Sequence, residues 1–134
     1  MAKLQNYNGR YCEQEFEYAF LSYLEAEGWH YLSGNSISRP SRREVLYADD
    51  LEQFLCKTNP DLVAEEIQQI MDTVRLVGAE SDFATLHKVY GWMVDGVQFT
   101  PQSGLAKMVN LIDFYNPENN IFRAVNQFVV EYTN

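Results

Sequence analysis

The sequence is poor in the side chains that build metal and redox sites. Its 134 residues include 2 Cys and 2 His, and these four residues stand far apart in the sequence. A metal site usually shows at least two ligands at close spacing, so we expect no metal site in this chain. With so few cysteines and no secretion signal at the N-terminus, the sequence favours a reducing, cytoplasmic location. No apolar run approaches the about 20 residues of a membrane-spanning helix, so no membrane association is expected.

Positive charge is also scarce. Ten Lys and Arg stand against 19 Asp and Glu, which gives a formal net charge of -9. This excess argues against a surface that clamps nucleic acid over its whole extent, although a local patch can still make contact. Arg39, Arg42 and Arg43 form such a patch in a Ser-rich loop over residues 33–43. They are the candidate contacts to DNA phosphates, and a solvated loop is the other interpretation.

Apolar residues are present in sufficient number for one globular domain, at 46% with 14% aromatics. Apolar spacing predicts a helix from about Glu13 to Gly28, and a short strand is expected at 29–32. A second helix is expected from Asp49, with Glu52 at capping-box spacing. The residues expected to face inward in the first helix are Phe16, Phe20, Tyr23 and Leu24.

Two further helices are expected in the middle of the chain. Asn59 as N-cap and Pro60 at the first helical position predict a helix that ends at Gly78. Ser81 is expected to cap a fourth helix over residues 82–94. The apolar side chains expected to face inward are Val63, Ile67, Ile70, Val74 and Val77 in the third helix and Phe83, Leu86, Tyr90 and Met93 in the fourth.

The periodicity changes to that of strands after residue 96. Short strands are expected at 97–100, 106–113 and 121–132, the last two joined by a turn at 116–120. Asn126 and Gln127 are expected to hydrogen-bond within the fold, with Asn110 as the expected partner of Asn126. The result is an α+β fold, with about four N-terminal helices followed by a short, mainly antiparallel sheet. Because the best strand ends the sequence, we expect either helices over its edge or a sheet that continues in further sequence.

No complete catalytic site is visible. The sequence has no phosphate-binding loop, no dinucleotide-binding glycine pattern and no nucleophile elbow. Asp61 follows Pro60 at an expected helix start, where the helix dipole explains a carboxylate. Asp113 fits either a carboxylate at a strand end or the start of a turn. Glu13 and Glu17 share one helix face, which is either solvated or turned towards a nuclease site.

The most distinctive stretch is the run from Val109 to Phe128, VNLIDFYNPENNIFRAVNQF. It resembles the N-terminal region of the restriction (R) subunit of type I restriction–modification enzymes. A leading helix with Glu13 and Glu17 that ends at Gly28, the segment 46–62 with DLEQFL, and Gly96-Val97 are similar to that family too. The resemblance covers about residues 11–132.

The resemblance implies a DNA-cleaving, ATP-driven translocase whose nuclease domain has the PD-(D/E)xK fold. The chain would then be an N-terminal fragment (residues 1–134) of the endonuclease domain, without the main catalytic motifs and without the motor. Mg²⁺ and ATP are implied for the full-length subunit and neither for the fragment. Glu13, with Glu17 as second choice, would be the acidic residue of the site. The implied partners are double-stranded DNA and the methyltransferase and specificity subunits.

Two other interpretations of the sequence remain open. A small acidic protein-interaction module without enzymatic activity is consistent with the charge and with the lack of an active site. A regulatory DNA-binding domain would need a basic recognition helix, and none of the four expected helices is basic.

Overall fold

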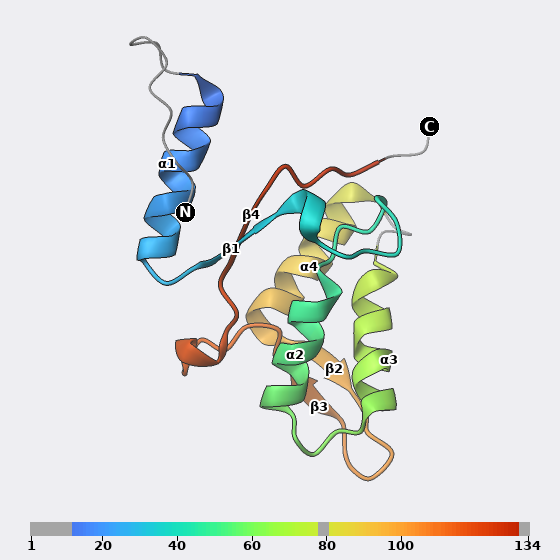
Figure 1. The fold of residues 1–134 in the computed structure, drawn as a ribbon. Coiled ribbons are helices and arrows are strands. Elements are labelled where there is room, and N and C mark those ends of the chain that lie inside the picture. Colours follow the sequence, from blue (N-terminus) through green and yellow to red (C-terminus); the bar gives the residue numbers. More distant parts are fainter. Residues whose placement is uncertain (1–11, 78–80, 132–134) are drawn as a thin grey trace. The chain divides into compact units, whose positions relative to one another are not determined.

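The computed structural model describes residues 12–77 and 81–131 (Figure 1). Its secondary structure confirms the α+β class. The elements are, in chain order, helix α1 (Glu13–Ala26), strand β1 (His30–Ser33), 3-10 helix η1 (Gly34–Ser36), helices α2 (Ala48–Thr58), α3 (Ala64–Arg75) and α4 (Asp82–Asp95), strands β2 (Val97–Phe99) and β3 (Lys107–Val109), 3-10 helix η2 (Pro117–Asn119) and strand β4 (Arg123–Asn126). None of the helices in the described ranges is long and apolar enough to cross a membrane.

The chain divides into two compact units. Unit 1 combines residues 1–45 with residues 122–134, and unit 2 comprises residues 46–121. Unit 2 is therefore inserted in the sequence between the two segments that make unit 1.

Unit 2 contains the hydrophobic core. Helices α2 and α3 pack against each other, and β2 pairs with β3 in antiparallel register. Leu55, Ile70 and Val109 are completely buried there. The core cluster consists of Phe54, Leu55, Ile67, Ile70, Met71 and Val109.

A charged side chain starts α3 inside this unit. The Glu66 side chain is buried, and its two carboxylate oxygens accept hydrogen bonds from the backbone N–H groups of Val63 (3.1 Å) and Gln102 (3.0 Å). Glu66 thus satisfies a free N–H group at the helix start and fixes the loop after β2.

Unit 1 is built on two parallel strands. Tyr31 of β1 lies opposite Ala124 of β4, and the N–H of His30 donates to the carbonyl of Phe122 at 2.8 Å. The Trp29 and Phe122 rings meet edge to face at 5.2 Å where the strands begin. Helix α1 contacts both strands and buries Leu21.

Gly34, directly after β1, lies against the backbone that follows β4. A Cβ atom on Gly34 would come within 2.3 Å of the Gln127 carbonyl oxygen and 2.7 Å of that of Asn126. Only glycine fits there without moving backbone, because real Cβ atoms do not approach other atoms so closely.

The expected pairing of the last two strands is wrong. Residues 106–113 and 121–132 contain β3 and β4, but β3 pairs with β2 and β4 pairs with β1. Asn126 therefore lies beside β1, and its Oδ1 accepts a hydrogen bond from the Tyr31 hydroxyl at 2.7 Å. Tyr31, and not the expected Asn110, is thus the partner of Asn126. The turn expected between the strands is present as η2, but it joins strands of different sheets.

The caps of α2 and α3 also differ from the expectation. The N-cap of α2 is Tyr47, and no side chain caps this helix. Asp49, the expected first residue, lies inside the first turn of α2, where the helix dipole favours a carboxylate. Asn59 ends α2 and does not begin α3, because its side chain donates back to the Leu55 carbonyl at 3.0 Å. Pro60 and Asp61 consequently lie in the turn between the helices. Gly78, the expected end of α3, lies outside the described residues.

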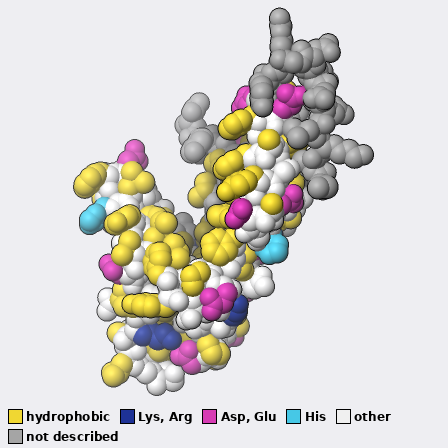
Figure 2. All heavy atoms as spheres, turned by 90° about the vertical axis from the view of Figure 1, so that its left-hand side faces the viewer, with side chains coloured by type: hydrophobic (Ala, Val, Ile, Leu, Met, Phe, Trp, Pro, Cys, Tyr) yellow, Lys and Arg dark blue, Asp and Glu magenta, His cyan; other side chains and the backbone are white. Residues whose placement is uncertain are grey.

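The expected inner faces of α1 and α4 are exposed. Phe16 and Phe20 in α1 are 67% and 55% exposed, and Phe83 and Leu86 in α4 are 81% and 70% exposed. Hydrophobic side chains consequently lie at the surface in Figure 2. The half-buried side of α4 carries Ala84, Thr85, Val89 and Trp92. Ser81 does cap α4 as expected, because its hydroxyl accepts from the Ala84 N–H at 3.3 Å.

Candidate functional site

Glu13 and Glu17 line one pocket of unit 1. The pocket has a volume of about 570 Å³ and lies where α1 faces β4. One helical turn separates the two carboxylates, which places them on the same face of α1. Aromatic residues of α1 and Trp29 form its apolar wall, and Arg123, Asn126 and Gln127 form its polar wall. This mixture of apolar wall and convergent polar groups is typical of ligand sites.

Glu17 is held in place by Gln127, the residue that follows β4. The amide nitrogen Nε2 of Gln127 donates to both carboxylate oxygens of Glu17, at 3.2 and 3.3 Å. Gln127 has a φ of 52°, which is uncommon for a residue other than glycine and costs free energy. The expectation that Gln127 and Asn126 hydrogen-bond within the fold is confirmed. No local sequence pattern indicates that Gln127 belongs to the site, because its partner Glu17 lies 110 positions away.

Arg39 is bound within unit 1 on two sides. Its Nη1 donates to the Glu44 carbonyl at 2.8 Å and its Nη2 to the Val129 carbonyl at 2.7 Å. The guanidinium carbon also lies 4.0 Å from the centre of the Phe128 ring. Arg39 therefore links the loop after η1 to the segment after β4.

Arg42 and Arg43 are more exposed than Arg39. The Arg42 guanidinium pairs with the Glu131 carboxylate at 3.2 Å, and both side chains are about 60% exposed, at 63% and 59%. A backbone hydrogen bond of 2.9 Å, from the Glu131 N–H to the Arg42 carbonyl, supports this pair. The Arg43 backbone N–H donates to the Ser41 hydroxyl, which shapes the loop locally.

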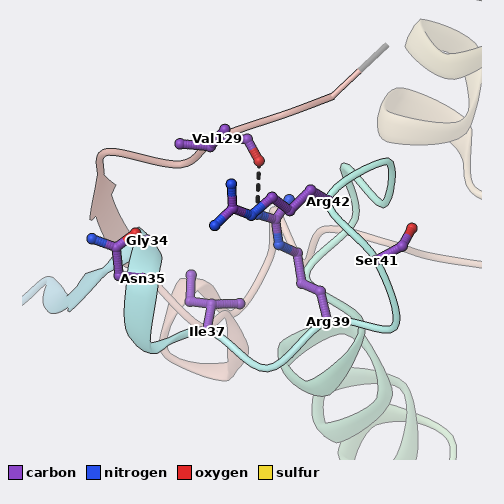
Figure 3. Close-up of a pocket in the computed structure, with 7 residues that line it drawn as sticks. All are labelled: Gly34, Asn35, Ile37, Arg39, Ser41, Arg42 and Val129. Carbon is purple, nitrogen blue, oxygen red and sulfur yellow. Dashed lines mark hydrogen bonds between the residues drawn. The ribbon is translucent and has the colours of Figure 1, made fainter. Parts of the chain in front are cut away.

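Arg39 and Arg42 line a second pocket of unit 1. It has a volume of about 240 Å³, and Asn35, Ile37 and Ser41 are also part of its wall (Figure 3). The structure thus brings Glu13 and Glu17 together in one pocket and Arg39 and Arg42 in another. Arg43 lines neither of these two pockets.

Asp113 organises the turn of the distinctive run. Its Oδ1 accepts from the N–H groups of Tyr115 (3.0 Å) and Asn116 (2.9 Å), and its Oδ2 from the Asn119 amide (3.0 Å). The Asn120 side chain bonds the Asp113 backbone: its Oδ1 accepts from the Asp113 N–H, and its Nδ2 donates to the Asp113 carbonyl. The hydrogen bond from Asn119, with those from the two N–H groups, lowers the pKa of Asp113 below its ordinary value of 3.8. Asp113 therefore starts a turn, the second of its two expected roles, and the DFYNPENN letters encode that turn.

Asp61 forms an ion pair in unit 2. Its Oδ2 lies 3.0 Å from the Nζ of Lys107 on β3, and this hydrogen bond lowers the pKa of the Asp61 carboxyl. The contact ties the turn after α2 to β3.

Across residues 12–77 and 81–131, no three His, Cys, Asp or Glu side chains gather as a group that could hold a metal ion. Glu13 and Glu17 together supply two carboxylates, the number that Mg²⁺ commonly takes from a protein beside water and phosphate oxygens. They fit part of a magnesium site.

Comparison with known proteins defines the family. The family model described as "Type I restriction enzyme R protein N terminus" matches residues 10–134. The chain therefore belongs to the family of N-terminal regions of type I restriction enzyme R proteins. It is 30% identical, over 132 residues, to the type I restriction enzyme HindI endonuclease subunit of Haemophilus influenzae. The match covers 88% of this chain and 12% of the length of that relative. No solved structure is significantly similar to the chain.

Proposed function

We propose that the full-length form of this chain cleaves double-stranded DNA in an ATP- and Mg²⁺-dependent manner. It works in the cytoplasm, in a complex with methyltransferase and specificity subunits. The chain of residues 1–134 is the first part of the endonuclease domain and by itself neither cleaves DNA nor hydrolyses ATP. The membership in the R protein family and the endonuclease subunit among the relatives support this proposal.

The observation that carries the proposal at the residue level is the pocket beside β4. Glu13 provides a carboxylate for the nuclease site, and Glu17 is the second choice. Both carboxylates line this pocket, and the Gln127 amide holds that of Glu17. A magnesium ion at such a site stabilises negative charge on a phosphate and activates water. The remaining metal ligands come from other parts of the enzyme.

ATP is proposed to bind in another part of the full-length subunit, because this sequence contains no phosphate-binding loop. The role proposed for this chain is in DNA cleavage. The acidic residues of α1 position the metal ion, and the loop with Arg39, Arg42 and Arg43 contacts DNA phosphates.

The first test uses the chain as it is. Purified residues 1–134 are incubated with supercoiled plasmid and Mg²⁺, and nicking is followed on agarose gels. We expect no nicking above that of a buffer control. Robust nicking that requires Mg²⁺ would contradict the proposed division of the site.

The second test uses the R subunit that contains this sequence, assembled with its partner subunits. Glu13→Gln is expected to lower DNA cleavage about 100-fold or more, because a metal ion supplies several kcal/mol of transition-state stabilisation. ATP hydrolysis is expected to persist. Glu17→Gln keeps the oxygen that accepts from Gln127 and so tests the charge alone. Glu25→Gln, at an exposed α1 position outside the pocket, is the matched control.

One observation favours an interaction module as the second candidate function. Helix α4 has no buried residue and exposes large apolar side chains, a feature typical of protein-binding surfaces. If neither Glu13→Gln nor Glu17→Gln changes cleavage by the assembled enzyme, this candidate is favoured for the chain.

A further inference from the structure

We propose that the pocket lined by Arg39 and Arg42 binds a single phosphate group. In the absence of phosphate, the Glu131 carboxylate forms an ion pair with Arg42, and the phosphate displaces this carboxylate when it binds. The phosphate pocket extends the DNA contact proposed above for the loop with Arg39 and Arg42. It rests on the proposed function only in taking DNA as the source of the phosphate. The recognition chemistry is the same for a phosphate of the DNA backbone and for a free phosphate ion.

Arg39 gives the pocket a fixed positive charge. Its two hydrogen bonds to backbone carbonyls, at 2.8 and 2.7 Å, and the Phe128 ring hold the guanidinium in one place. These two bonds use one N–H of Nη1 and one of Nη2, and a guanidinium has five N–H donors. The carbonyls do not neutralise the charge, so Arg39 remains an electrostatic attractor for an anion.

Arg42 supplies the exchangeable donor. Its side chain is 63% exposed and its partner, Glu131, is 59% exposed, so the ion pair is screened by water. Exposed ion pairs contribute little to stability, and replacing a carboxylate by a phosphate at such a pair costs little. A phosphate offers more acceptor oxygens to the guanidinium group than a single carboxylate oxygen does.

The remaining wall of the pocket suits a small polar ligand. Ser41 and Asn35 line the pocket with Arg39 and Arg42, so polar residues form part of its wall (Figure 3). The volume of about 240 Å³ lies below the about 300–1,000 Å³ of pockets for drug-sized ligands. The size favours a phosphate group over a nucleotide.

The experiment follows backbone amide and Arg Nε–H signals of the full 134-residue chain by NMR during titration with inorganic phosphate. Sodium chloride at matched ionic strength corrects for salt effects. We expect saturable shifts at Asn35 and Ser41. Arg42→Gln is expected to weaken phosphate binding about tenfold or more. Lys57→Gln makes the same change of charge at an exposed position of α2 and is expected to leave it within about twofold.

The competing carboxylate provides an independent test. Glu131→Gln is expected to tighten phosphate binding about two- to fivefold, because the Glu131 carboxylate no longer competes for Arg42. This factor corresponds to the free energy of an exposed ion pair. An equal loss of binding in Arg42→Gln and Lys57→Gln would overturn the proposal, as would phosphate shifts that do not saturate. Unchanged affinity in Glu131→Gln would overturn the part assigned to Glu131.

A short DNA duplex distinguishes the two sources of phosphate. If the duplex shifts the same amide signals and competes with inorganic phosphate, the pocket holds a backbone phosphate. If only inorganic phosphate binds, the pocket proposal stands and the proposed DNA contact of this loop fails. Loss of cleavage in the Glu13 and Glu17 variants bears on neither outcome, because those residues line the other pocket.

Discussion

The two units of the chain differ in composition: unit 2 contains most of the buried apolar side chains, and unit 1 contains the two pockets. All five of the largest completely buried side chains belong to unit 2, namely Leu55, Ile67, Ile70, Met71 and Val109. Unit 1 buries few apolar side chains but carries the two pockets that the acidic and basic candidate residues line. The difference indicates that unit 2 provides most of the stability of the fold. Unit 1 instead holds exposed charged groups in fixed positions through hydrogen bonds.

The two tryptophans make this comparison measurable. Trp29 belongs to unit 1 and Trp92 to unit 2, and the chain has no other tryptophan. Trp29→Phe leaves a fluorescent reporter in unit 2, and Trp92→Phe leaves one in unit 1. Unfolding in urea can then be followed for each unit separately.

The largest effect is expected from Ile70→Ala in the core of unit 2. Ile70 is completely buried in α3, so its truncation leaves a cavity and should lower the free energy of unfolding by about 2–5 kcal/mol. Urea denaturation read from Trp92 measures the change. A loss below about 1 kcal/mol would indicate that unit 2 is not the main source of stability.

Gly34→Ala should destabilise unit 1 by about 1–3 kcal/mol. The added Cβ would meet the Gln127 carbonyl oxygen at 2.3 Å, so backbone has to move. The Trp29 signal should report the loss, and the Trp92 signal should change less. Gly91→Ala is the control, since its Cβ would meet nothing within 4 Å. Equal effects on both tryptophan signals would show that the units unfold as one.

Acidification should weaken the Asp113 turn in unit 2. The pKa of Asp113 is lowered in the fold, so its contribution is complete above the ordinary value of 3.8 and is lost as the pH falls through the lower, folded value. The difference in unfolding free energy between wild type and Asp113→Asn should therefore be largest near neutral pH and shrink below about pH 4. Urea titrations at several pH values, read from Trp92, measure it. A difference that is constant with pH would contradict the role of the charged carboxylate.

The smallest effect is expected from Leu86→Ser on α4. Leu86 is 70% exposed, so the substitution should change the free energy of unfolding by at most about 0.5 kcal/mol. The same denaturation experiment applies. A loss of about 2 kcal/mol or more would mean that the α4 face is packed, and unit 2 would then have a larger core.

The sequence predicted the helices well and their surroundings poorly. The spacing of apolar residues predicts both α3 and α4, yet Ile67 and Ile70 are buried and Phe83 and Leu86 are exposed. Periodicity identifies an apolar face but not the surface that covers it. Asn59 illustrates the same limit at a helix end, because an Asn side chain can bond either forward to a following helix or back to a preceding one.

Contacts between residues far apart in the sequence were the other feature that the sequence did not predict. The partner of Asn126 is Tyr31, 95 positions earlier, and the partner of Glu17 is Gln127, 110 positions later. Local patterns carry no signal for such contacts, so sequence reasoning paired β4 with its nearest neighbour in the chain. The acidic helix face and the Arg-rich loop, by contrast, are visible as local runs. Glu13 and Glu17 line one pocket of unit 1, and Arg39 and Arg42 line the other.

The insertion of unit 2 between β1 and β4 sets an order of folding events. Ala48 and Leu51 near its start and Ile121 at its end all pack against one core, so folding of unit 2 brings its two ends together. Once this has happened, β1 and β4 are neighbours, and most of the entropy cost of closing the long loop between them has already been met. During synthesis, β1 has no strand partner until β4 (Arg123–Asn126) has left the ribosome. Its edge is unpaired over that interval and is then exposed to aggregation.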